Sequence, residues 1–307
     1  MRIGITSVSN MKEEWNSGDV ADLRQSIVRS GNSAKTVYAD SLDIVLGRSG
    51  SRIFQSSDRA AGAKEGREEL ELDAVLLRHL GTIRDYEQFT HRLFCIKSFE
   101  ERGTYVMNGV MEWLFATDKL GALLKLSGKG LPIPETVATE HMFVAYSASR
   151  RFGSSVVKPL RSAMGFGVFK VDDPDLAMHA FSYLTNLSKP IYVQRYLDKK
   201  RNGDYRVVVV GGEVVGAEFR KGATWKSNVA QGAKPVAAKV DGELGELSIK
   251  ACEALSLEYA GIDIADTREG YVILETNPTL SWQGFKKATK INPAGKIVRH
   301  LLDKVRN

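Results

Sequence analysis

The sequence predicts a mixed fold in which an α/β lobe precedes two lobes of α+β character. In the first third, strand-like residues 1–7 and 73–77 alternate with the helical spacing of residues 19–30 and 86–102, as in a parallel sheet covered by helices. In the second half, Gly211-Gly212 separates two apolar runs, which is typical of an antiparallel hairpin. We therefore expect an N-terminal α/β lobe (1–107), a small central lobe (108–190) and a C-terminal lobe with an antiparallel sheet (191–307).

The other elements follow from the same periodic patterns. In the N-terminal half we expect short strands at 36–38, 43–46 and 105–107, and a helix over 117–126 with Thr117 as its N-cap. Residues 47–71 are polar and rich in glycine without a clear period, so we expect a surface excursion or a mobile loop. In the C-terminal half we expect strands at 154–158, 168–171, 191–196, 205–210, 214–219, 259–265 and 271–276, and helices at 175–187 and 243–256.

The composition narrows the classes of function. The chain has 307 residues, of which 43% are hydrophobic and 26% charged, and no apolar run is long enough to span a bilayer. Its start lacks a secretion signal, so we expect a cytoplasmic protein. Two isolated cysteines, Cys95 and Cys252, argue against a disulfide framework or a zinc site. The net charge of +6 favours anionic ligands such as nucleotides and polycarboxylates, whereas no nucleic-acid recognition motif is found.

The most informative feature is a group of oxygen-bearing side chains on the last predicted hairpin. Glu275 and Asn277 are two residues apart on one strand, so their side chains share a face. If the turn is centred near Glu269, Asp263 on the preceding strand faces Glu275. The flanking residues are apolar, so acids here need a partner, and an oxygen-only set suits Mg²⁺. We predict a magnesium site; the alternative is two acids that point into solvent.

A second group of residues suits phosphates. Lys158 ends an apolar strand, and Gly165 and Gly167 in the following loop allow backbone N–H groups to approach phosphates closely. The loop matches neither a P-loop nor a dinucleotide-binding fingerprint, and a plain hairpin turn is the alternative interpretation.

Further candidates lie at element ends. Arg220 ends a strand and suits a transferring phosphoryl group through its planar fork. Lys119, taken alone, is typical of a solvated surface charge. The loop at 226–228 either contacts the metal or a phosphate, or forms a solvated turn.

In this order, these features resemble the ATP-grasp superfamily, and more closely the RimK-type α-L-glutamate ligases. The resemblance extends from about Leu76 to the C-terminus, and it is specific as an ordered set although each segment is short. The matching segments are LLRHLG (76–81), GTYVMN (103–108), TDK (117–119), VVKP (156–159), SAMGFGV (162–168), YVQRYL (192–197), DYR (204–206), KSN (226–228), AGIDI (260–264), LETNP (274–278) and WQGF…INPAGKI (282–297). The N-terminal half is most similar to archaeal members that add glutamate to coenzymes.

The resemblance implies a role for each matching position. Lys119 and Lys158 correspond to lysines on the nucleotide phosphates, and residues 162–167, with Ser162, Gly165 and Gly167, to a mobile flap. The other implied nucleotide contacts are the adenine hinge and three further positions: Gln194, Arg195, Tyr196, Leu197, Asp204, Lys226, Ser227 and Asn228. Arg195 departs from the glutamate that is usual in the hinge. The implied Mg²⁺ ligands are Asp263, Glu275 and Asn277, and Arg220 corresponds to the catalytic arginine at the reacting phosphoryl group.

The resemblance further implies an ATP- and Mg²⁺-dependent ligase, with Mn²⁺ as an alternative metal, that activates a carboxylate as an acyl phosphate and joins it to an amine. The expected partners are a carboxylate acceptor, either a coenzyme of the tetrahydromethanopterin or deazaflavin type or a peptide, and an amino acid, L-glutamate. Arg78 is the candidate contact for the acceptor carboxylate, and a homo-oligomer, a dimer or tetramer, is expected. We expect neither a nucleic-acid partner nor a membrane partner.

Three alternatives remain open at this point. The first is ligation of an amino acid to a carrier protein in lysine or arginine synthesis. The second is a nucleotide-binding regulator without catalysis, and the third is a phosphotransferase that makes a stable phosphorylated product. Measuring ADP release and product identity across a panel of carboxylates would separate them.

Overall fold

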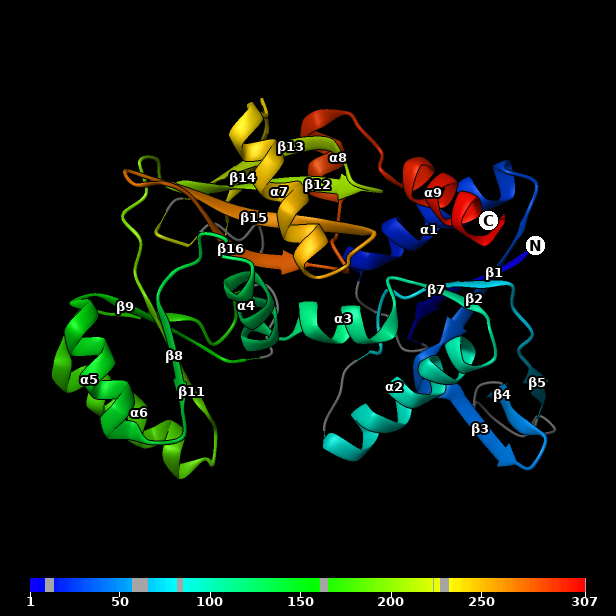
Figure 1. Cartoon of the computed structure of the whole chain (residues 1–307), viewed down its shortest axis with the longest axis horizontal. Helices are drawn as coiled ribbons and strands as arrows, with labels where there is room; N and C mark the ends of the chain where they lie inside the picture. The colour runs from blue at the N-terminus through cyan, green and yellow to red at the C-terminus, as the bar shows by residue number, and fades with distance from the viewer. Residues whose placement is uncertain are drawn as a thin grey trace.

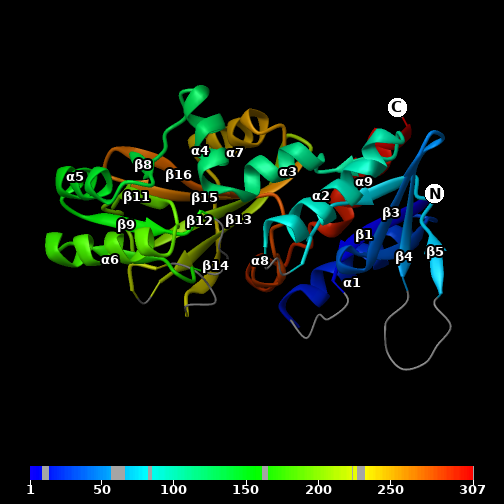
Figure 2. The ribbon, with the colours of Figure 1, turned by 90° about the horizontal axis from the view of Figure 1, so that it is seen from below.

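The computed structural model describes residues 1–8, 14–56, 66–81, 85–160, 165–222, 224–226 and 232–306. The central lobe lies at one end of the long axis and the N-terminal lobe at the other, with the large C-terminal sheet between them (Figure 1 and Figure 2). Among the described residues, no helix is both long and apolar enough to cross a bilayer.

The N-terminal lobe is built on the predicted parallel sheet. Its strands are β1 (Arg2–Ser7), β2 (Ser33–Tyr38), β6 (Ala74–Leu76) and β7 (Tyr105–Met107), in the order β2-β1-β6-β7. The helices are α1 (Glu14–Arg29) and α2 (Tyr86–Glu101), with a 3-10 turn at Ala39–Ser41. Asp85 caps α2 by accepting a hydrogen bond from the Gln88 backbone N–H, so this helix begins where a capping side chain is available.

The segment 47–71, expected to be a surface excursion or a mobile loop, contains strands at residues 50–56 and 67–69, so the expectation of a loop was wrong there. A second, antiparallel sheet is formed by β3 (Leu42–Gly47), β4 (Gly50–Ser56) and β5 (Arg67–Glu69). Its single fully buried apolar anchor on β4 is Ile53, and Arg52 and Arg67 lie against the Phe54 ring. Because long polar side chains cover most of this sheet, the apolar alternation that reveals a strand is weak here.

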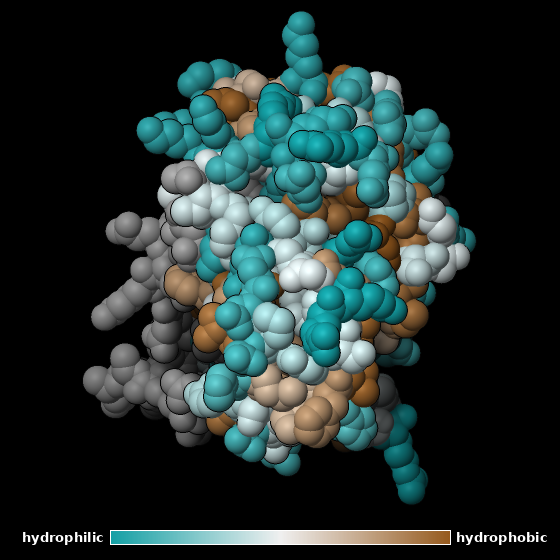
Figure 3. Space-filling model, turned by 90° about the vertical axis from the view of Figure 1, so that its left-hand side faces the viewer, coloured by the Kyte–Doolittle hydropathy of each residue, from teal (hydrophilic) through white to brown (hydrophobic). Residues whose placement is uncertain are grey.

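The central lobe contains a four-stranded antiparallel sheet covered by two helices. Two helices, α3 (Val110–Thr117) and α4 (Lys119–Gly128), lead into it. The lobe itself comprises β8 (Thr136–Thr139), α5 (Met142–Phe152), β9 (Ser155–Lys158), β10 (Phe169–Val171), α6 (Pro174–Asn186) and β11 (Ile191–Arg195). The strand order is β10-β9-β11-β8, so β11 belongs to this sheet and not to the lobe predicted at 191–307. On the outer face of this lobe, exposed apolar side chains lie dispersed among hydrophilic ones (Figure 3).

The C-terminal lobe is a five-stranded antiparallel sheet with helices on both faces. Its elements are β12 (Gly203–Val210), β13 (Glu213–Lys221), β14 (Lys234–Ala238), α7 (Gly242–Ala254), β15 (Tyr259–Thr267), β16 (Gly270–Asn277), α8 (Gln283–Thr289) and α9 (Ala294–Arg306). The strand order is β14-β13-β12-β15-β16. Tyr205, Val207 and Val209 of β12 enter the core under α7 and α4.

The opposite face of this sheet changes character along its length. At one end Val208 and Val210 share a core with α8, α9 and the N-terminal lobe. At the other end the same face of β12 carries Asp204 and Arg206, because side chains on a strand alternate with a period of two. This face of β12 is therefore apolar where it packs against the N-terminal lobe and polar at its other end.

Candidate active site

The predicted pairing of the two carboxylates is confirmed. In the β15–β16 hairpin Asp263 stands opposite Glu275, and Asn277 stands opposite Gly261. Counting from the turn at Thr267–Gly270 alone would place Asp263 opposite Leu274, but a register shift between Asp263 and Ile264 moves the pairing by one residue and brings Glu275 opposite Asp263. The three oxygen-bearing side chains therefore share one face at the end of two neighbouring strands.

Asp263 is held by two arginines, Arg206 from the adjacent strand β12 and Arg220 from β13, the next strand of the sheet. Its Oδ1 and Oδ2 atoms accept hydrogen bonds from Arg206 at 2.8 and 2.9 Å, and Oδ2 also lies 2.8 Å from Arg220 Nη2. Burial disfavours the charged carboxylate, but the guanidinium groups of Arg206 and Arg220 outweigh it and lower the pKa of Asp263 to about 2. Asp263 is thus an anion whose position is fixed.

Arg220 links Asp263 to Asp204. Its Nε donates to Asp204 Oδ1 at 2.8 Å, and its Nη2 lies 2.7 Å from the same oxygen. The two carboxylates raise the pKa of the guanidinium well above its usual range, against the effect of burial. Lys199 adds a further positive charge, 4.0 Å from Asp204 Oδ2. Burial and the charge of Arg220 lower the pKa of Lys199, although Asp204 and Asp263 oppose this.

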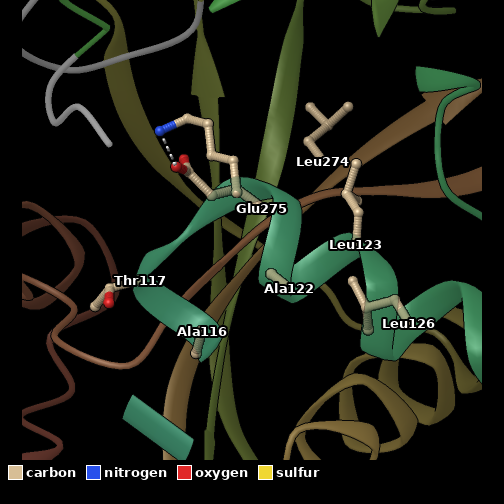
Figure 4. A pocket seen from close by; sticks show the side chains of 8 residues that line it. Ala116, Thr117, Ala122, Leu123, Leu126, Leu274 and Glu275 are labelled. Atoms are coloured by element: carbon tan, nitrogen blue, oxygen red, sulfur yellow. Dashed lines mark ion pairs between the residues drawn. The ribbon is translucent and has the colours of Figure 1, made fainter. Parts of the chain in front are cut away.

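Lys119, the first residue of α4, contacts the β15–β16 hairpin. Its Nζ lies 3.3 Å from Glu275 Oε1, an ion pair drawn as a dashed line in Figure 4, next to a small pocket lined by α3, α4 and β16. Asp118 sets the position of this lysine, since its carboxylate caps α4 by accepting hydrogen bonds from the N–H groups of Leu120 and Gly121. The prediction of Thr117 as the N-cap was wrong: Thr117 ends α3, and its hydroxyl donates to the Trp113 carbonyl.

Lys158 is the last residue of β9, in the sheet of the central lobe. Its Nζ donates to Gln194 Oε1 at 2.6 Å, and Gln194 in turn donates to Thr136 and Tyr192. Burial lowers the pKa of the Lys158 ammonium to about 8, with help from the charges of Lys119 and Lys199 and against that of Glu275. The side chain of Gln194 is therefore committed to positioning a lysine.

Lys158 gives a first prediction. Because its folded-state pKa is lowered to about 8, its positive charge is present below that pH and lost as the pH rises through it. We expect kcat/KM for ATP, which reports the free enzyme, to fall roughly tenfold per pH unit above 8. In Lys158→Arg the fall should disappear, because arginine stays charged. Initial rates at saturating acceptor from pH 6.5 to 9.5 measure this, and an unchanged fall in the arginine variant would assign it to another group.

The predicted hinge and flap are only partly described. Arg195 and Tyr196 donate their backbone N–H groups to the carbonyls of Glu135 and Ser154, and the Tyr196 ring lies under Lys170 and edge-on to Trp225. Leu197 is the second residue after the end of β11. Gly165 and Gly167 have φ angles of 74° and 71°, so the predicted glycine-dependent turn is present. Lys226 lies with its Nζ 5.5 Å from the Trp225 ring centre. Ser162, Ser227 and Asn228 fall outside the described residues.

Arg78 lies in the interface between the N-terminal and C-terminal lobes. Its guanidinium is fully buried, 3.3 Å from Asp19 Oδ2 and 2.9 Å from the Leu280 carbonyl, and it stacks on the Trp282 ring. In this arrangement Arg78 joins the end of β6 to α1 and to the segment that leads into α8. To bind an acceptor carboxylate, Arg78 would have to give up its contacts with Asp19 and the Leu280 carbonyl. The role of Arg78 in acceptor binding stays a prediction.

The residues present fit a hard divalent ion. Asp263, Glu275 and Asn277 offer only oxygen ligands, and Mg²⁺ usually takes one or two carboxylates together with phosphate oxygens. The Glu275 side chain is 33% exposed and so remains open to the site, whereas the oxygens of Asp263 are already shared with arginine. Among the described residues, no group of three or more histidine, cysteine, aspartate or glutamate side chains forms a metal cage. The arrangement therefore suits a metal ion whose remaining ligands are the phosphate oxygens of a bound nucleotide.

Three residues of this site were missed in the sequence: Arg206, Lys199 and Glu218. Arg206 and Glu218 are each two positions from a predicted residue, Asp204 and Arg220, and so share its face of the sheet. The period of two could have identified both. Lys199 gave no signal, since it lies outside the named strands and reaches the site through an isolated bridge to Thr267.

The fold and this site define an ATP-grasp ligase. The solved ATP-grasp ligase PsnB, complexed with its minimal precursor, Mg and ADP, has a TM-score of 0.72 with 20% identity, over 99% of this chain and 98% of PsnB. A RimK domain ATP-grasp protein from Sphaerobacter thermophilus has a TM-score of 0.71, 20% identity and 98% coverage of both chains. At this level of identity these likenesses show the fold alone.

The chain belongs to the RimK-like ATP-grasp family, whose domain matches residues 116–301. It is similar to the tetrahydromethanopterin:alpha-L-glutamate ligase of Methanocaldococcus jannaschii, with 33% identity over 199 residues, which are 62% of this chain and 68% of the relative. The corresponding ligase of Methanosarcina acetivorans is 30% identical over 261 residues, 75% of this chain and 80% of the relative. This chain is accordingly an ATP-dependent ligase that forms amide bonds.

Proposed function

We propose that this ligase joins L-glutamate to a carboxylate of a coenzyme-type acceptor through an acyl phosphate. The observation that carries the proposal is the hairpin of Asp263 and Glu275, which lies between two arginines on its own sheet and Lys119 on the facing side. This distribution of charge suits a metal-bound nucleotide next to an anionic acceptor. The names of the archaeal relatives support glutamate and the acceptor class.

Each of the site residues has a role that follows from its position. Lys119 and Lys158 hold the ATP phosphates from the central lobe, and Arg220 faces the phosphoryl group that is transferred. Asp263, Glu275 and Asn277 would hold Mg²⁺, or Mn²⁺ as the alternative, which neutralises charge on the phosphates when bound. An acceptor carboxylate oxygen attacks the γ-phosphorus and ADP leaves; the amine of glutamate then attacks the acyl carbon and inorganic phosphate leaves. The chain supplies positioning and charge stabilisation and no covalent nucleophile.

Mass spectrometry of the products tests this function. The protein is incubated with ATP, Mg²⁺, L-glutamate and, separately, tetrahydromethanopterin, a deazaflavin coenzyme, a glutamate-ended peptide and an acidic carrier protein. We expect a coenzyme product heavier by one glutamyl residue for each ADP formed. Amide formation only on the carrier protein or only on the peptide would replace the acceptor in this proposal, and ADP without any amide would contradict it.

Trapping with hydroxylamine tests the intermediate. An acyl phosphate reacts with hydroxylamine to give a hydroxamate, whereas a stable phosphorylated product does not. We expect hydroxamate when hydroxylamine replaces glutamate, and none without ATP. A phosphorylated acceptor that survives this treatment would identify a phosphotransferase instead. The proposed dimer or tetramer is checked separately by light scattering.

A further inference from the structure

Glu218 is a buried carboxylate that forms no ion pair with a described side chain. It lies on β13, two residues before Arg220, and is 2% exposed. Its Oε2 atom is enclosed and receives no hydrogen bond from the described residues, and no ion pair within the described part of the chain includes Glu218. Burying such a group disfavours the folded state, so its presence in a site indicates that a ligand supplies the missing partner.

Strand register places Glu218 in the row of active-site charges. Glu218 stands opposite Arg206, Arg206 opposite Asp263, and Asp263 opposite Glu275, across the four neighbouring strands β13, β12, β15 and β16. Since neighbouring strands are about 4.8 Å apart, the backbone of Glu218 lies roughly 10 Å from that of Asp263. The metal-binding acids therefore occupy one end of the row, Arg206 lies between, and Glu218 occupies the other end.

The nearby cations are already committed to other acids. Arg206 gives both of its hydrogen bonds in this row to Asp263, and Arg220 divides its bonds between Asp204 and Asp263. Burial accordingly raises the pKa of Glu218, although the charges of Arg206 and Arg220 partly offset this. The two arginines are thus paired with Asp204 and Asp263, and Glu218 is left without an arginine at hydrogen-bonding distance.

The surroundings of Glu218 favour a compact cation. The nearest part of α8 is Gly284, where a Cβ would lie 4.0 Å from Glu218 Oε2, so no side chain at this position fills the space beside the carboxylate. A second divalent ion would need several oxygen ligands, and the neighbouring aspartates are bound to arginine. An amino group needs only one vacant acceptor and supplies its own N–H donors.

We propose that Glu218 forms the subsite for the amino group of the amino acid that this ligase joins to its acceptor. The inference rests on the proposed function, and it assigns the side of the site from which the amine approaches. The amine would reach the activated carboxyl group past Arg206, from the end of the row opposite the metal ligands. Glu218 would orient the nitrogen by accepting its N–H hydrogen bond.

Binding of L-glutamate and of glutarate, which lacks only the amino group, tests the subsite. Calorimetry is done on the full chain with Mg²⁺ and a non-hydrolysable ATP analogue. The wild type should bind L-glutamate about ten- to a hundredfold more tightly than glutarate, as expected for a hydrogen bond to a charged group. Glu218→Gln should bring the two affinities within about threefold, mainly by weakening glutamate binding. A wild type without this preference, or a variant that keeps it, would overturn the inference.

Two further variants exclude a general effect. Glu213→Gln removes a carboxylate from the exposed end of the same strand, where it pairs with Lys296, and should keep the wild-type preference. Glu218→Asp keeps the charge but withdraws it by one methylene, and should show an intermediate preference. If Glu213→Gln lost the preference, or Glu218→Asp kept all of it, the specific subsite would be rejected.

Stability and trapping separate this inference from the proposed function. A carboxyl group with a raised folded-state pKa contributes stability at low pH that is lost as the pH rises, so Glu218→Gln should raise Tm at pH 7, by about 2 °C. A lower Tm would instead indicate a structural role and count against the subsite. Absence of hydroxamate and amide in the wild type would reject the proposed function, whereas wild-type glutamate preference in Glu218→Gln would reject only the subsite.

Discussion

Glu275→Ala is expected to fold normally and to lose ligation. The Glu275 side chain is 33% exposed, so its removal opens no cavity in the core, and its partner Lys119 at 3.3 Å is 11% exposed and keeps some access to water. Its loss does remove a fixed negative charge from the proposed metal site. Losing one preorganised group of this kind costs about 3–4 kcal/mol in the transition state, or roughly two to three decades in rate. The measurements are ADP release under saturating substrates, Mg²⁺ titration and thermal unfolding.

The matched control lies in the turn of the same hairpin. Glu269→Ala removes a carboxylate from the β15–β16 turn, outside both strands, and should leave the rate within twofold. We expect the Mg²⁺ concentration for half-maximal rate to rise in Glu275→Ala and not in Glu269→Ala. If Glu275→Ala kept its activity within threefold of wild type, the assignment of Glu275 to the metal would be wrong.

The hairpin was predictable because its geometry is local. Asp263, Glu275 and the turn between them lie within a short stretch of sequence, so a turn centred near Glu269 is enough to predict that they face each other. The register shift next to Asp263, which produces this pairing in the structure, has no signal in the sequence. The partners of Asp263 were not predictable in the same way. Arg206 reaches it through the pairing of β12 with β15, and no local signal sets the register of two strands separated by about fifty residues of chain.

The predictions that failed did so where local signals were weak or ambiguous. Both Thr117 and Asp118 suit a helix start, and the outcome depends on α3, which ends at Thr117 and leaves Asp118 to cap α4. In the sheet of β3–β5, side chains such as Arg52 and Glu69 pair with each other across strands, so polar residues stabilise strands that their composition does not indicate. The lobe boundary at 190/191 failed because β11 pairs with β8 and β9, a non-local choice.

The predicted role of Arg220 is sharpened by its burial between two aspartates. If Arg220 only contacted a phosphoryl oxygen of the substrate, its removal would not affect folding. The structure instead places it 2.7 Å from Asp204 and 2.8 Å from Asp263, with 3% of its side chain exposed. Removing one partner of a buried ion pair destabilises a protein by about 3–5 kcal/mol, because the remaining charge is left without compensation.

Arg220→Ala should therefore lose about 3–5 kcal/mol in the free energy of unfolding, and Arg220→Lys should lose less. Lysine keeps the charge, but a single ammonium cannot reproduce the fork that contacts both aspartates, so Arg220→Lys should remain folded and lose at least about tenfold in kcat/KM for the acceptor. Urea denaturation and initial rates measure the two effects. Lys221→Ala, at the exposed neighbouring position on β13, should change neither. If Arg220→Lys matched the wild type in both measurements, the positive charge alone would suffice, and the bidentate bridge between Asp204 and Asp263 would have no part in arranging the site.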